Sequence, residues 1–212
     1  MVGAVLAIMA FVIALTFDEA NNQFDARKGA LLEDVTSIQT TYLRAKLLPE
    51  PHRTTVRSLL RDYVQVRAGI IYAYGEPDTL RLVQQRANAI QALIWSNVET
   101  ISGDDNFSRI EEIFVKSLNN LFSMHTKQVA LGAYYRIPTA MWLALTIASG
   151  VAMFAVGFHF GIGGNRRIYT ANFALALTYA IVMVLAFDLD RAGEGMIIVN
   201  QQPMLDLYQS MQ

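Results

Sequence analysis

The sequence contains no cysteine and no excess of either charge. Across its 212 residues, 17 lysines and arginines stand against 18 aspartates and glutamates, giving a formal net charge of -1. The absence of thiols excludes disulfides, cysteine nucleophiles, zinc-thiolate sites and iron-sulfur clusters. The absence of a basic excess excludes nucleic acid as an expected partner.

Charged residues are also scarce, and they are unevenly placed. Only 17% of the residues are charged while 53% are hydrophobic, which is not the composition of a soluble cytosolic enzyme. Residues 1–17, 137–165 and 168–187 contain no Asp, Glu, Lys or Arg. Because a helix needs about 20 apolar residues to cross a bilayer, these windows predict three transmembrane helices, at 1–17, 137–160 and 168–187.

The first and second windows each invite another interpretation. A cleavable signal peptide would begin with basic residues and end in a small-residue cleavage site, and neither is found before Asp18, so residues 1–17 are predicted to be an anchor.

The tight loop at 161–167 is glycine-rich, but no strand precedes it and the GxGxxG spacing is missing. Nucleotide binding is therefore not predicted there.

Residues 18–136 form a polar insert with 14 basic and 14 acidic residues. Apolar residues recur in it at helical spacing, along four stripes: Leu31, Val35, Ile38 and Tyr42; Val56, Leu59, Leu60, Tyr63, Val64, Ile70 and Ile71; Leu80, Val83, Ala87, Ile90, Ile94 and Val98; and Ile110, Phe114, Leu118, Leu121 and His125. The first stripe extends the first transmembrane helix outward until Pro49 and Pro51. Ser108 and Glu111 predict a capping box at the start of the last helix. We expect an all-α membrane protein with an antiparallel helical-bundle insert between its first two transmembrane helices and a polar tail at 188–212.

No catalytic, cofactor or metal site is predicted. His52, His125 and His159 each lack a second ligand at the helical spacing that a metal site requires. Glu111 and Glu112 are adjacent, so a helix points them about 100° apart and they do not form an acid/base pair. The transmembrane windows hold no Asp, Glu, Lys or Arg for chemistry, and an enzyme is therefore not expected.

Small residues repeat at every fourth position of the transmembrane windows, a pattern that marks close helix contacts in a bilayer. The repeats are Ala140, Ala144, Ala148 and Ala152; Gly157 and Gly161; Gly3 and Ala7; Ala10 and Ala14; and Ala176 and Ala180. Packing among the chain's own three helices is favoured over an oligomer interface.

Two acids, Asp188 and Asp190, end the third transmembrane window and are followed by Arg191. Acids at a helix C-terminus oppose the helix dipole, so another group must hold them. A local pairing with Arg191 or with a basic residue of the insert is favoured over a cation site or a gating contact.

Three separated motifs carry a family resemblance. They are Phe24, Asp25 and Arg27; Tyr42, Leu43, Arg44, Pro49 and Pro51; and Asp188, Asp190, Arg191, Gly195 and Pro203. Together they resemble the bestrophin-like family of bacterial membrane proteins, named for distant similarity to bestrophin chloride channels, and the likeness covers nearly the whole chain. Family members usually have another transmembrane helix ahead of the one that begins here at Met1, four in all. Bestrophins also have a calcium-binding acidic cluster after the last transmembrane helix, but Asp188 and Asp190 are too few to predict calcium.

The resemblance implies an integral protein of the bacterial inner membrane that forms a homo-oligomer, a pentamer in bestrophins, around a path for chloride or other anions. The first transmembrane helix would line that path, with Ile8, Phe11 and Leu15 one turn apart as a hydrophobic neck. The same residues suit a helix that faces lipid. The alternative function is a non-conducting, membrane-anchored helical sensor or scaffold protein.

Basic residues near the membrane favour a cytoplasmic insert. Five lie on the insert side and two on the opposite side, and positive charge is enriched on the cytoplasmic side of membranes. The five are Arg27, Lys28, Lys127, Arg136 and Arg191, and the two are Arg166 and Arg167.

Overall fold

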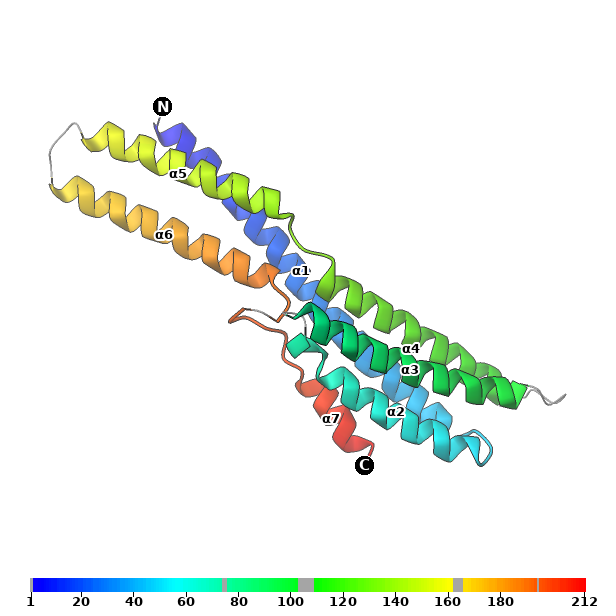
Figure 1. The fold of residues 1–212 in the computed structure, drawn as a ribbon. Coiled ribbons are helices and arrows are strands. Elements are labelled where there is room, and N and C mark those ends of the chain that lie inside the picture. Colours follow the sequence, from blue (N-terminus) through cyan, green and yellow to red (C-terminus); the bar gives the residue numbers. More distant parts are fainter. Residues whose placement is uncertain (1, 74–75, 103–108, 162–165, 194) are drawn as a thin grey trace. The chain divides into compact units, whose positions relative to one another are not determined.

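The computed structural model of the chain describes residues 2–73, 76–102, 109–161, 166–193 and 195–212, and every regular element in these ranges is a helix (Figure 1). In chain order the elements are α1 (Val2–Ala45), α2 (His52–Ala68), the 3-10 helix η1 (Ile70–Ala73), α3 (Pro77–Ser102), α4 (Arg109–Ala133), α5 (Thr139–Gly161), α6 (Arg166–Asp190) and α7 (Gln202–Ser210). The prediction of an all-α protein is confirmed.

The chain divides into two compact units. The membrane unit comprises Met1–Phe24, Arg136–Arg191 and Gly195–Ile197, and the bundle unit comprises Asp25–Tyr135, Ala192–Glu194 and Ile198–Gln212. The helix α1 contributes to both units, because it continues without a break from Val2 to Ala45. The sequence predicts this continuation from the apolar stripe that precedes Pro49 and Pro51.

The membrane unit contains the helices that can cross a bilayer. Among the described residues, three helical segments are long and apolar enough to do so, Gly3–Ala45, Thr139–His159 and Asn172–Asp190, in agreement with the three predicted transmembrane helices. Two clusters of apolar side chains pack this unit. One contains Ala20, Ile137, Trp142, Leu145, Ala186 and Leu189, and the other contains Met9, Ile13 and Ala152.

The small-residue pattern of α5 is only partly explained by packing within the chain. Ala152 is 1% exposed and packs against Met9 and Ile13, as expected for contact between the chain's own helices. Ala140, Ala144 and Ala148 are exposed, so the prediction that the chain's own helices cover them is wrong. Spacing identifies a close-packing surface on a helix, but it does not identify the partner.

The bundle unit is built from the second part of α1 with α2, η1, α3, α4 and α7. Its core follows the predicted stripes closely: Val56, Leu60, Tyr63 and Val64 of α2 and Phe114, Leu118 and Leu121 of α4 are all at most 1% exposed. Within the bundle unit α2 packs against both α3 and α7. Burial of one apolar face per helix therefore holds this unit together.

Two details of the predicted stripes differ from the structure. The stripe of α2 does not continue as α-helix to Ile70, because α2 ends before Gly69, a poor helix former, and Ile70 is buried within η1. Ile110 is 46% exposed, so its predicted burial is wrong: helical spacing gives the direction of a face, not how far a neighbouring helix extends along it. The predicted cap Ser108 and residues 162–165 of the predicted loop lie outside the described residues.

Candidate functional site

The first part of α1 has one face toward its neighbours and one face uncovered by them. Met9 and Ile13 are 7% and 5% exposed and pack in the membrane unit. Ile8, Phe11 and Leu15, the residues of the predicted neck, are 64%, 64% and 54% exposed. They lie one turn apart along the helix, and they form an apolar row that the described part of the membrane unit leaves open.

A buried carboxylate connects the C-terminal end of α6 to the N-terminal end of α5. Asp190 ends α6 and is 3% exposed. Its Oδ1 accepts a hydrogen bond from the main-chain N–H of Ile137 at 2.9 Å, and its Oδ2 accepts one from the indole Nε1–H of Trp142 at 3.3 Å. Hydrogen bonds to a charged acceptor are stronger than neutral ones, so the end of α6 is fixed to the start of α5.

Aromatic contacts extend this junction. The ring of Trp142 meets that of Phe187 edge-on, with centroids 5.2 Å apart and an interplanar angle of 89°. The guanidinium of Arg191 lies 4.3 Å from the centroid of Phe187 on the ring face, a cation–π arrangement. The sequence predicts Arg191 as an ion-pair partner for the two acids. In the structure its guanidinium lies over the ring of Phe187.

Asp188 closes the turn that follows α6. Its two carboxylate oxygens accept the main-chain N–H groups of Met196 and Ile197 at 2.8 Å and 2.7 Å. Gly195 sits directly against this carboxylate, and a Cβ at that position would overlap the side chain of Asp188. The glycine of the motif is therefore explained by close approach rather than by an unusual backbone angle.

The two acids at the end of α6 are therefore occupied by N–H donors, which satisfies the requirement that some group offset the helix dipole. In the described part of the chain no three His, Cys, Asp or Glu residues come together in a way that could hold a metal ion. The junction of Asp188, Asp190, Trp142 and Gly195 thus has the geometry of a structural clamp.

A second motif group lies in the bundle unit, around Tyr42 near the end of α1. The Tyr42 hydroxyl accepts a hydrogen bond from Arg57 at 2.8 Å and donates one to the carbonyl of Met211 at 3.1 Å. The Arg57 guanidinium also lies 4.7 Å from the Tyr42 ring centroid. One side chain of α1 therefore joins α2 and the C-terminal segment.

The remaining motif residues are distributed over both units. Phe24 packs on the core of the membrane unit, whereas Arg27 is buried and Asp25 exposed in the bundle unit. Leu43 is 52% exposed, and Arg44 donates to the carbonyl of Ile113 at 3.3 Å. Pro49 and Pro51 occupy the corner between α1 and α2, and Pro203 lies in the first turn of α7. The motifs thus mark separate structural positions rather than one site.

A fully buried ion pair in the bundle unit is not among the features predicted from the sequence. Asp34 of α1 and Arg67 of α2 are both 0% exposed, and Arg67 donates from Nη2 at 2.9 Å and from Nε at 3.3 Å to Oδ2 of Asp34. A signal was present, because each residue lies at helical spacing within an apolar stripe: Asp34 follows Leu31 by three positions, and Arg67 follows Tyr63 by four.

Two titratable side chains lie near this pair. The rings of Tyr63 and His125 are 6.1 Å apart between centroids. Burial lowers the pKa of His125 from 6.5 to about 3, with a smaller contribution from the positive charge of Arg67, so this imidazole is neutral near pH 7. Burial also raises the pKa of the Tyr63 phenol. The centre of the bundle therefore holds one charged pair and two neutral rings.

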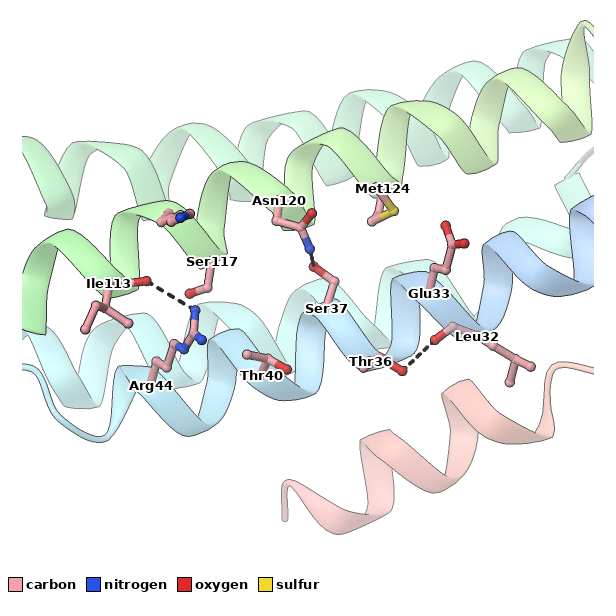
Figure 2. A pocket seen from close by; sticks show the side chains of 11 residues that line it. Leu32, Glu33, Thr36, Ser37, Thr40, Arg44, Ile113, Ser117, Asn120 and Met124 are labelled. Atoms are coloured by element: carbon pink, nitrogen blue, oxygen red, sulfur yellow. Dashed lines mark hydrogen bonds between the residues drawn. The ribbon is translucent and has the colours of Figure 1, made fainter.

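A hollow lies in the bundle unit, between α1 and α4 (Figure 2). It has a volume of about 900 Å³ and is an open groove. Its lining residues are Leu32, Glu33, Thr36, Ser37, Thr40 and Arg44 of α1, and Ile113, Lys116, Ser117, Asn120 and Met124 of α4. Figure 2 shows Asn120 and Ser37 pointing toward each other across it.

Comparison with known proteins identifies a family and a fold. Residues 1–204 match the sequence profile of the Bestrophin-like domain. No curated protein matches the chain.

Several solved structures have a similar fold. One is a single-substitution variant of a bacterial bestrophin homologue from Klebsiella pneumoniae, with a TM-score of 0.77 and 13% identity over 99% of this chain and 86% of that one. A second variant of a Klebsiella pneumoniae bestrophin homologue gives 0.74 and 12% over 99% and 83%. A variant described only as a membrane protein gives 0.80 and 12% over 99% and 84%. At such identities the likeness establishes the fold and nothing more.

Proposed function

Because the chain belongs to the Bestrophin-like family, we propose that it forms an ion channel for anions such as chloride, built as a ring of identical subunits in the membrane. The described residues supply three helices that can cross a membrane, and these are too few to enclose an aqueous path alone. A ring of copies is the arrangement that the family resemblance implies, with five subunits as in bestrophins.

The observation that carries this proposal is the uncovered apolar row of α1. Ile8, Phe11 and Leu15 are each more than half exposed, while the opposite face of the same helix is packed. In a ring with α1 toward its centre, these three side chains form successive apolar constrictions. A narrow apolar constriction empties of water and so controls ion passage.

The assignment of compartment follows from charge. We place the protein in the bacterial inner membrane with the bundle unit in the cytoplasm, since the basic residues flanking the membrane are more numerous on that side. The chain contains no cysteine. A single cysteine introduced at exposed Ser123 would therefore report the side of the bundle by its reaction with an impermeant thiol reagent in intact cells.

The pore assignment is tested by Phe11→Ala in the full chain reconstituted into liposomes. Removing the ring widens and wets the constriction, so chloride flux is expected to rise several-fold. Phe154→Ala is the matched control, because Phe154 is 75% exposed on α5 and is assigned to lipid. Flux that is unchanged by Phe11→Ala, or raised equally by both variants, would reject this lining. Absence of flux from every protein would favour the sensor or scaffold function instead.

A further inference from the structure

The two ends of the groove between α1 and α4 differ in charge, and hydrogen bonds between the helices identify the residues at each end. Hydrogen bonds set the two helices antiparallel: Arg44 bonds to the carbonyl of Ile113, Thr41 to that of Ser117 at 3.1 Å, and Asn120 to Ser37 at 3.0 Å. Farther along, Lys127 pairs with Glu33 at 2.6 Å. The register therefore places Lys116, which lies between Ile113 and Ser117, at the same end as Arg44.

That end of the groove carries two positive charges from different helices. Within the described residues neither Arg44 nor Lys116 has a carboxylate at ion-pair distance. Arg44 is half-buried, and the bond from its Nη1 to Ile113 at 3.3 Å holds the guanidinium against the wall. Its other N–H groups remain available, and a planar guanidinium suits a carboxylate or phosphate.

The middle and far parts of the groove complete the binding chemistry. The Ser37 hydroxyl accepts a hydrogen bond from Asn120 and keeps its own proton to donate. Apolar surface comes from Ile113 at the Arg44 end and from Leu32 and Met124 toward the Glu33 end, with Leu32 48% and Ile113 41% exposed. The acid Glu33 lies at the far end and is already paired with Lys127. The charge pattern thus favours a negative group at the Arg44 end only.

We propose that this groove binds a small organic anion, with its carboxylate or phosphate at Arg44 and Lys116 and its apolar body along Leu32, Ile113 and Met124. The volume of about 900 Å³ admits a ligand of many heavy atoms, since a water molecule takes about 30 Å³ of liquid. The site does not depend on conduction, and binding is measured without flux.

The absence of native cysteine makes a protection experiment possible. In the full chain, Thr36→Cys places one thiol in the groove at an exposed position, and its reaction rate with a maleimide is followed. Benzoate is the probe, and benzamide is the uncharged control of nearly the same shape. We expect benzoate at about nine times its Kd, where the site is occupied about nine-tenths of the time, to slow the reaction about tenfold, and benzamide to leave the rate unchanged.

Charge variants then test the assigned residues. In the Thr36→Cys background, Lys116→Gln or Arg44→Gln should raise the benzoate concentration that gives half-maximal protection about tenfold. This is the effect on affinity of losing one hydrogen bond to a charged group. Arg81→Gln, an exposed arginine outside the groove, should not. A cysteine at Ser123, on the exposed side of α4, should react at one rate with or without benzoate.

Three results would overturn the proposal. Equal protection by benzoate and benzamide would mean that the groove recognises apolar shape and not charge. Protection that survives both charge variants would place the anion elsewhere. A thiol at position 36 that does not react even without ligand, while the one at position 123 does, would mean that a second copy of the chain covers the groove.

Discussion

At the scale of single residues, the structure explains motif positions by close contact. Gly195 lies against the carboxylate of Asp188, which in turn accepts the N–H groups of Met196 and Ile197. The glycine is required because the Asp188 carboxylate fills the space where a Cβ would lie. The acid is required because its carboxylate accepts the two main-chain N–H groups.

Gly195→Ala is expected to destabilise the membrane unit by about 2 kcal/mol, because the added methyl group displaces the Asp188 carboxylate from its two donors. Gly29→Ala in α1 is the matched control. A Cβ there meets nothing within 4 Å, and alanine is the better helix former by about 1 kcal/mol. Thermal unfolding of both variants in detergent measures the difference, and an equal effect of the two substitutions would contradict the clamp.

His125 gives the bundle unit a dependence on pH. Its pKa is about 3 in the folded chain and 6.5 when unperturbed, so between these values the unfolded chain binds the extra proton. Stability is therefore complete above about pH 6.5 and falls as the pH decreases toward 3, by up to about 1.4 kcal/mol per pH unit.

His125→Gln tests this dependence, since the amide keeps hydrogen-bonding capacity and does not titrate. The stability of the original chain relative to this variant should decline from pH 7 to pH 5, as measured by denaturant unfolding at each pH. Parallel pH curves for the two proteins would show that His125 is not buried in its neutral form.

At the scale of helices, sequence periodicity predicts elements and faces well but partners poorly. The continuous α1, the corner at Pro49 and Pro51, and the buried faces of α2 and α4 all follow from spacing. The ion pair between Asp34 and Arg67 does not, because it joins residues of two helices whose relative register depends on packing. Polar residues within an apolar stripe are the available signal, and each needs a partner that only the tertiary structure supplies.

The buried pair makes a prediction about the contact between α1 and α2. Arg67→Met should cost about 3–5 kcal/mol, because it leaves the Asp34 carboxylate buried without its counter-charge. Adding Asp34→Leu should restore much of the loss, since an apolar pair of similar volume avoids the desolvation of two charges.

The surface pair of Glu33 and Lys127 on the same bundle is the control, with both side chains about half exposed. Lys127→Gln should cost less than about 1 kcal/mol. Chemical unfolding of the single and double variants measures the coupling. If the double variant were as unstable as the sum of its two single variants, the account of this pair would be wrong.

At the scale of the whole molecule, the sequence predicts the membrane helices because a bilayer tolerates few charges. Long stretches without charge can be recognised from the sequence alone. The α1–α4 groove is different. It depends on hydrogen bonds between residues as far apart as Thr41 and Ser117, and helical spacing holds no information about such a register. The exposed Ala140, Ala144 and Ala148 show the same limit, since their spacing does not reveal whether another helix covers them.

The central claim is that copies of this chain assemble into a ring around an ion path. Light scattering coupled to size-exclusion chromatography of the full chain in detergent gives the number of subunits most directly. The account predicts a single closed assembly, of five subunits by analogy with bestrophins. A monomer or a dimer would contradict it, because the three helices of the described residues that can cross a membrane cannot surround a central path in so few copies.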